Sequence, residues 1–144
     1  MKKSLSIEVN SNICNISVVR VAVSTFISDI PGITLEDITD VKTSISEAVS
    51  NCIEHAYLDE NGIIKVECTV EEDSVMLKII DSGIGIEDIE LAITPAYTSK
   101  PEEEHAGLGF TIMENFMDSV EVESDVGKGT RNSMFKKIVN KKIV

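Results

Sequence analysis

The chain contains no tryptophan, and aromatic residues make up only 4% of its 144 residues. A core must therefore be built from aliphatic side chains, and the hydrophobic fraction of 42% is typical of a globular protein. The length suits one domain, residues 1–144, that buries a core without a disulfide or a structural metal. No apolar run approaches the roughly 20 residues that a transmembrane helix requires, and no apolar secretory segment follows Lys2 and Lys3. We therefore expect a cytoplasmic protein.

Cysteine and positive charge are also scarce. Cys14, Cys52 and Cys68 are odd in number and far apart, which argues against a disulfide framework and against a zinc site. We interpret all three as small buried apolar residues. The 13 basic and 25 acidic residues give a net charge of −12, which disfavours direct binding to nucleic acid and suits a basic protein partner. A purely solubilising role for this charge is the alternative.

Hydrophobic periodicity divides the chain into strands and helices. Alternation of apolar and polar side chains predicts strands over residues 4–10, 64–70, 75–80, 120–123 and 129–139. Spacing of three and four residues predicts helices over residues 16–30, 34–57 and 110–117, with Thr34 as the N-cap of the second. This order of elements predicts an α/β (α+β) two-layer sandwich, in which helices pack on one face of a mixed, largely antiparallel sheet.

The second predicted helix carries a row of polar side chains, Glu47, Asn51 and His55, spaced four residues apart. Each step of four residues rotates by only about 40°, so the three side chains lie in one row, opposite the buried stripe. The alternative is a solvated helix face, and on the helix alone that interpretation is favoured.

Three glycine-containing segments follow. Residues 81–85 (DSGIG) come directly after a strand, where a carboxylate can accept a hydrogen bond from an exocyclic amine and glycines let backbone approach a flat ring. Residues 107–110 (GLGF) open a helix, whose free N–H groups form a natural phosphate site. Residues 127–130 (GKGT) fit a hairpin turn. Each segment alone is a weak signal, since such residues are also ordinary turn formers.

In this order and spacing, the polar row and the three glycine segments resemble the GHKL (Bergerat-type) ATP-binding superfamily. Four longer sequence segments indicate a particular family within this superfamily. They are EAVSNCIEHAY at 47–57, AYTSKP at 96–101, HAGLGFTIMENFMD at 105–118 and GKGT at 127–130. These strings resemble the anti-sigma factor serine kinases, and most closely the anti-sigma F factors of sporulating Gram-positive bacteria. The resemblance covers nearly the whole chain.

The resemblance implies ATP and Mg²⁺ as cofactors and assigns the catalytic roles to the polar row. Asn51 would ligate the Mg²⁺ that bridges the phosphates, because an amide oxygen is a suitable hard ligand. Glu47 would act as the general base that accepts the proton of the attacking serine hydroxyl. His55 would orient the end of the helix rather than take part in the chemistry.

The same resemblance assigns further nucleotide-binding residues. They are Asp81 with Gly83 and Gly85 at the adenine, Thr130 supporting that contact, Gly107, Leu108 and Gly109 at the phosphates, and Thr98, Ser99 and Lys100 in a lid over residues 95–106.

Three other positions bear on the resemblance. Arg20 corresponds to a partner-docking arginine, although a surface charge on an amphipathic helix explains it equally well. His105 stands where the relatives carry an arginine, which implies a weaker, pH-dependent charge beside the lid. Asn132 stands where an apolar residue is expected, so we expect the last strand to be irregular or to lie at an edge of the sheet.

The implied function is that of an anti-sigma factor with protein serine kinase activity, working as a homodimer. Its ATP-bound form would hold a sigma factor of the sporulation (sigma F) type, and it would phosphorylate a competing anti-anti-sigma factor on serine. Two alternatives remain open from the sequence: the detached ATPase domain of a histidine kinase, and a nucleotide-gated binding module without catalysis.

Overall fold

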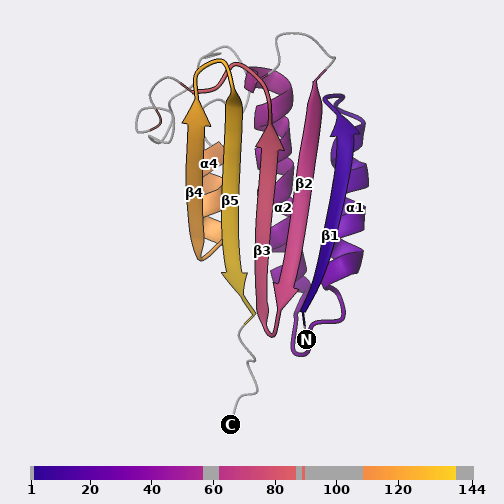
Figure 1. The fold of residues 1–144 in the computed structure, drawn as a ribbon. Helices are drawn as coiled ribbons and strands as arrows, with labels where there is room; N and C mark the ends of the chain where they lie inside the picture. The colour runs from indigo at the N-terminus through magenta and orange to yellow at the C-terminus, as the bar shows by residue number, and fades with distance from the viewer. Residues whose placement is uncertain (1, 57–61, 87–88, 90–108, 139–144) are drawn as a thin grey trace.

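A five-stranded sheet forms one layer of the molecule in the computed structural model, which describes residues 2–56, 62–86, 89 and 109–138 (Figure 1). The strands are β1 (Lys2–Asn10), β2 (Ile63–Glu71), β3 (Ser74–Asp81), β4 (Ser119–Asp125) and β5 (Gly129–Lys137). They are arranged in the order β1-β2-β3-β5-β4, and every pairing among them is antiparallel. The predicted sandwich is therefore confirmed, and the described sheet is antiparallel rather than mixed.

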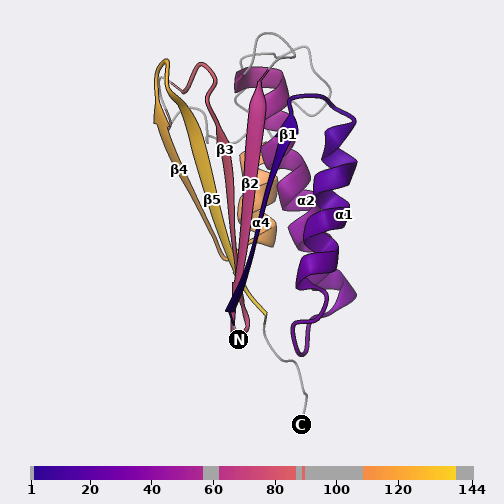
Figure 2. The same cartoon turned by 45° about the vertical axis from the view of Figure 1, so that its right-hand side comes forward.

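Helices cover one face of this sheet and form the second layer (Figure 2). They are α1 (Asn15–Ile27), α2 (Leu35–Asn51), which continues as the π-helix η1 (Cys52–Ala56), and α4 (Gly109–Phe116). Helix α2 occupies the middle of the layer and contacts both α1 and α4, which lie toward opposite edges of the sheet. None of the helices in the described part of the chain combines the length and the apolar character needed to span a bilayer.

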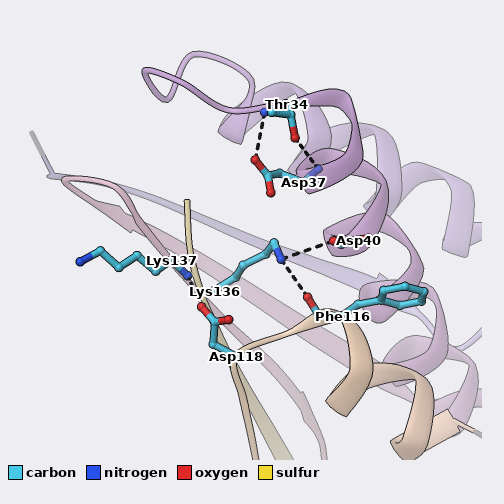
Figure 3. Close-up of polar contacts among 7 residues, drawn as sticks. All are labelled: Thr34, Asp37, Asp40, Phe116, Asp118, Lys136 and Lys137. Carbon is cyan, nitrogen blue, oxygen red and sulfur yellow. Dashed lines mark hydrogen bonds and ion pairs between the residues drawn. The ribbon is translucent and has the colours of Figure 1, made fainter. Parts of the chain in front are cut away.

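The start of α2 is fixed by a reciprocal capping box (Figure 3). The backbone N–H of Asp37 donates to Oγ1 of Thr34 at 3.0 Å, and the backbone N–H of Thr34 donates to Oδ2 of Asp37 at 3.0 Å. These bonds satisfy two donors that a helix N-terminus otherwise leaves without partners. Thr34 is thus confirmed as the N-cap, and this cap sets the rotation at which α2 presents Glu47 and Asn51.

The core is aliphatic, as the composition requires. Alternate residues of β2 and β3 point toward the helices and are buried, while the apolar stripes of α1 and α2 supply the facing side chains. The largest buried side chains include Val19, Ile27, Ile45, Ile64, Leu77, Ile79, Met113 and Met134. Burial of these side chains supplies the main force that holds α2 and α4 on the sheet.

Two expectations from the sequence are wrong. Cys14 is exposed rather than buried, because it lies in the turn just before α1 and its neighbours Ile13 and Asn12 are exposed as well. Asn132 is not in an irregular or edge strand: β5 lies between β3 and β4 with continuous register on both sides. Asn132 is only 6% exposed and donates from Nδ2 to Sδ of Met113 at 3.4 Å. A polar contact to α4 thus replaces the apolar packing expected at this position.

Lys136 ties the end of β5 to two helices (Figure 3). Its ammonium group lies 3.4 Å from Oδ2 of Asp40 on α2 and donates to the carbonyl oxygen of Phe116, the last residue of α4, at 2.9 Å. A cation at a helix C-terminus satisfies carbonyls that have no partner within the helix. Because both charged side chains are largely shielded from water, this contact fixes the position of α4 relative to α2.

We predict that Lys136→Met lowers the free energy of unfolding by about 1–2 kcal/mol, because it leaves Asp40 partly buried without its cation. Lys137→Met is the matched control, since its backbone N–H, and not its side chain, contacts Asp118 at 2.7 Å. The control should change the free energy of unfolding by less than about 0.5 kcal/mol. Urea denaturation of both variants measures the difference, and equal effects would contradict this account of the contact.

Candidate functional site

The last turns of α2 and the π-helix that follows carry the predicted catalytic row. Glu47 and Asn51 are half-buried in the last two turns of α2 and not directed into bulk solvent. From Cys52 to Ala56 the chain forms a π-helix, a feature that frequently occurs at functional sites. The four-residue repeat of an α-helix therefore ends at Asn51, and His55, also half-buried, does not simply continue the row.

The first residue of α4 lies directly against this row. A Cβ atom placed on Gly109 would be 3.2 Å from Nδ2 and 3.3 Å from Oδ1 of Asn51, and 3.4 Å from Oε2 of Glu47. The structure therefore brings together three of the predicted residues from two elements about 60 positions apart. A side chain at Gly109 would press on both polar groups, so glycine preserves the space between the helix start and the amide and carboxylate.

The carboxylate at the end of β3 is fixed by three donors. Oδ1 of Asp81 accepts from the backbone N–H of Gly83 at 3.0 Å and of Thr130 at 3.2 Å. Oδ2 accepts from Sγ of Cys52 at 3.3 Å. Asp81 is 6% exposed, so these bonds offset the unfavourable burial of a charged group and hold the carboxylate in one orientation.

Cys52 is a polar contributor that the sequence did not reveal. Burial, together with the neighbouring charge of Asp81, raises the pKa of the Cys52 thiol well above its usual value. The thiol therefore stays protonated at neutral pH and acts as a donor. Because Cys52 directly follows Asn51 in the chain, one stretch of backbone places an amide beside α4 and a thiol on Asp81.

The glycine loop after β3 packs against the end of the π-helix. The N–H of Ile84 donates to the carbonyl oxygen of Ala56 at 2.9 Å, and the carbonyl of Ile84 accepts from the N–H of Gly127 at 2.8 Å. A Cβ atom on Gly83 would collide with the carbonyl of Ala56, and Gly85 adopts a φ of +79°, which other residues rarely adopt. Both predicted glycines are thus required for the approach of this loop, Gly83 to the end of the π-helix and Gly85 to the β4–β5 turn.

A serine hydroxyl joins the same loop to the late hairpin. Oγ of Ser124 accepts from the N–H of Ile86 at 2.7 Å, lies 2.8 Å from Oγ1 of Thr130, and donates to the carbonyl of Gly129 at 3.0 Å. Sequence reasoning missed Ser124. Counting outward from the predicted turn at residues 127–129 would have placed it opposite Thr130, as the register of β4 and β5 does.

Other predicted residues are separate from this cluster or outside the described residues. Six of them lie outside the described residues: Thr98, Ser99, Lys100, His105, Gly107 and Leu108. Arg20 is described: it is exposed on α1, which α2 separates from α4 (Figure 2). Among the described residues, Arg20 is therefore separate from the polar cluster, and its role in docking a partner stays a prediction.

The described residues thus form two adjoining polar centres at one end of the helix layer. One consists of Glu47 and Asn51 beside the N-terminus of α4, where a carboxylate and an amide adjoin the positive end of a helix dipole. The other is Asp81, a buried and oriented acceptor. In Figure 1 the C-terminal ends of α2 and β3 and the β4–β5 turn gather at this end of the molecule. An elongated ligand with phosphates at one end and N–H donors at the other suits this arrangement.

Comparison with known proteins shows the family to which the chain belongs. The model of the histidine kinase-like ATPase domain family matches residues 9–136. The anti-sigma F factor of Clostridium kluyveri is 50% identical over 137 residues, which cover 95% of each chain. The anti-sigma F factor of Clostridium novyi is 52% identical over 125 residues, covering 86% of this chain and 87% of that protein.

Solved structures share the fold. The crystal structure of the RsbU and RsbW domains of a Mycobacterium tuberculosis protein matches 94% of this chain with a TM-score of 0.68 and 21% identity. This chain spans about a third (32%) of that structure. The catalytic domain of the histidine kinase ThkA, in a nucleotide-free form, matches 96% of this chain and 99% of its own length, with a TM-score of 0.59 and 22% identity. From the family match and the extent of identity, the chain belongs to the histidine kinase-like ATPase domain family and, within it, to the anti-sigma F factors.

Proposed function

We propose that the chain binds ATP with Mg²⁺ across the two polar centres and transfers the γ-phosphoryl group to a serine of an anti-anti-sigma factor. The observation that carries this proposal is the position of Gly109, on which an added Cβ atom would lie only 3.2–3.4 Å from the polar atoms of Asn51 and Glu47. A general base, a metal ligand and a helix N-terminus at one point form the minimal set of groups for phosphoryl transfer.

The residues at the phosphate end suit magnesium. Oδ1 of Asn51 is a hard, neutral oxygen ligand, and Mg²⁺ typically takes one or two protein oxygens, phosphate oxygens and several waters. When bound, the ion neutralises part of the negative charge of the phosphates. Without it, the net charge of −12 and the carboxylate of Glu47 at this point disfavour the binding of a triphosphate. Gly107, Leu108 and Gly109 present backbone N–H groups to the phosphates, and Thr98, Ser99 and Lys100 belong to the lid.

The residues at the base end suit adenine. A carboxylate offers about four lone-pair sites, and three donors already occupy Asp81. One site remains for the exocyclic amine of the purine, and the three existing bonds fix its direction. Gly83 and Gly85 allow the loop to lie against the flat ring, while Thr130 holds Asp81 in place.

In the transfer step, a carboxylate oxygen of Glu47 accepts the proton of the serine hydroxyl. The serine oxygen forms a bond to the γ-phosphorus, the bond from that phosphorus to the bridging oxygen breaks, and ADP leaves. Glu47 is half-buried on a helix whose N-cap and core contacts are fixed, so it needs little reorganisation to reach the hydroxyl. Glu47 is the catalytic residue, and His55 supports the end of the helix.

The membership in the anti-sigma F factors supports a regulatory role. The ATP-bound form holds a sigma factor of the sporulation type, and the unphosphorylated anti-anti-sigma factor competes for the same protein. Arg20 on the exposed face of α1 contacts one of these partners. The working unit is a cytoplasmic homodimer, and the bound nucleotide determines which partner is favoured.

Incubation with ATP labelled at the γ-phosphate, Mg²⁺ and a purified anti-anti-sigma factor tests the proposal. Acid-stable label on a serine of the partner is the expected result. Acid-labile label on a histidine would instead favour a histidine-kinase ATPase domain. Nucleotide-dependent binding of the sigma factor without any transfer would favour a binding module that lacks catalysis.

A further inference from the structure

Asn132 places a buried side-chain amide in the middle of the sheet. Its side chain is on the helix face of β5, where Nδ2 donates to Sδ of Met113 on α4 at 3.4 Å. Oδ1 is buried and has no hydrogen-bond partner among the residues that the structure describes. Buried carbonyl oxygens are nearly always hydrogen-bonded, and leaving one without a donor destabilises the fold. An apolar side chain at this position would avoid that penalty, so the presence of an amide here needs a functional explanation.

Asn132 lies next to Asp81 on the same face of the sheet. In the register of β3 and β5, Thr130 is opposite Asp81 and Asn132 is opposite Ile79. Asp81 contacts Cys52 and Asn132 contacts Met113, so both side chains point toward the helix layer. Diagonal neighbours of this kind are about 7–8 Å apart, a separation that one amine between two side-chain oxygens can bridge.

We infer that Oδ1 of Asn132 is a second acceptor for the exocyclic amine of the bound purine, an inference that rests on the proposed function. The amine carries two N–H groups, and Asp81 has one lone-pair site left for one of them. The second N–H goes to Asn132. Two acceptors select 6-amino purines and disfavour 6-oxo purines, whose carbonyl oxygen faces them without a proton to share. Asn132 is thus a residue that determines specificity for the purine base, and an apolar side chain at this position cannot accept the hydrogen bond.

The test compares the affinity for ATP with that for purine riboside triphosphate, which lacks the amine, by titration calorimetry with Mg²⁺. The wild-type chain should prefer ATP, and Asn132→Val should reduce the ratio of the two dissociation constants about fivefold to tenfold, the equilibrium value of one net hydrogen bond. Ser133→Ala, on the neighbouring residue and the opposite face of β5, is the matched control and should keep the wild-type ratio.

The nucleotide-free protein provides an independent measurement. Asn132→Val removes the unsatisfied oxygen, so its thermal unfolding midpoint should rise by about 3 °C while its preference for ATP falls. An unchanged ratio of dissociation constants overturns the inference, and so does a lower midpoint, which would mean that Oδ1 has a partner without ligand. The proposed function does not depend on these two results for Asn132→Val, provided that the wild-type chain binds ATP. If the wild-type chain binds neither nucleotide, the proposed function and the inference fail together.

Discussion

Glu47→Ala should leave the affinity for Mg²⁺ and ATP close to the wild-type value and lower the rate of serine phosphorylation by roughly 10²–10⁴-fold. The reason is that a general base acts on the incoming hydroxyl and not on the bound nucleotide. The structure places Oε2 of Glu47 beside the start of α4, adjacent to the amide of Asn51 but on a different turn of α2. Single-turnover transfer at saturating ATP, with binding measured separately by calorimetry, distinguishes the two effects.

Glu36→Ala is the matched control for this experiment. Glu36 is an exposed glutamate in the first turn of the same helix, and its removal alters the charge of the chain by the same amount. Transfer by this variant should stay within about twofold of wild type because the helix-dipole contribution of one surface carboxylate is small. A loss of nucleotide affinity in Glu47→Ala that matches the loss of transfer would contradict the role of general base.

Asn51→Ala should abolish the part of ATP binding that depends on Mg²⁺. Oδ1 of Asn51 is the neutral oxygen ligand at the phosphate end, and without it the carboxylate of Glu47 faces the phosphates with the metal no longer held between them. Affinity measured with Mg²⁺ should fall to the weak value that the wild-type chain shows in EDTA. The variant itself should show almost no difference between the two conditions.

Asn12→Ala provides the comparison for this variant, because Asn12 is an exposed asparagine whose Oδ1 accepts from the backbone N–H of Cys14 at 2.9 Å, within the turn before α1. It should retain the wild-type difference between Mg²⁺ and EDTA. Small and equal effects of Asn51→Ala and Glu47→Ala on binding and transfer would mean that the row is a solvated helix face, the interpretation that the helix alone favours.

The elements of the fold were largely predictable from local patterns. Alternation identified β2 and β3 because one face of each strand is buried by helices and the other is not. Thr34 was recognised as an N-cap because its chemistry is local. The position of β5 between β3 and β4 was not predictable in this way, because strand order is set by contacts between distant segments. A polar residue, Asn132, then led to a wrong expectation of an edge strand.

The site was predictable to the extent that its chemistry lies in short motifs. The motifs named Glu47, Asn51, Asp81 and Gly109, but not the way in which one helix end serves two centres. That depends on two consecutive residues, Asn51 and Cys52, of which the first places its amide beside α4 and the second directs its thiol toward Asp81. A cysteine is usually a small buried apolar residue, so its role as a donor emerges only with the carboxylate beside it.

The stability of this arrangement has a consequence for function. Lys136 anchors the C-terminus of α4 to α2, whereas the N-terminus of α4 at Gly109 is the end that meets the nucleotide in our proposal. The spacing between the helix start and the amide of Asn51 is therefore set partly from the opposite end of α4. Preorganisation of this kind lets binding energy act on the ligand instead of on the protein.

A crystal structure of the chain with Mg²⁺ and a non-hydrolysable ATP analogue tests the central claim most directly. Our account predicts the metal on Oδ1 of Asn51, the phosphates at the start of α4 next to Gly109, and the purine amine on the carboxylate of Asp81. A nucleotide bound elsewhere, or a bound nucleotide whose base does not reach Asp81, would contradict it.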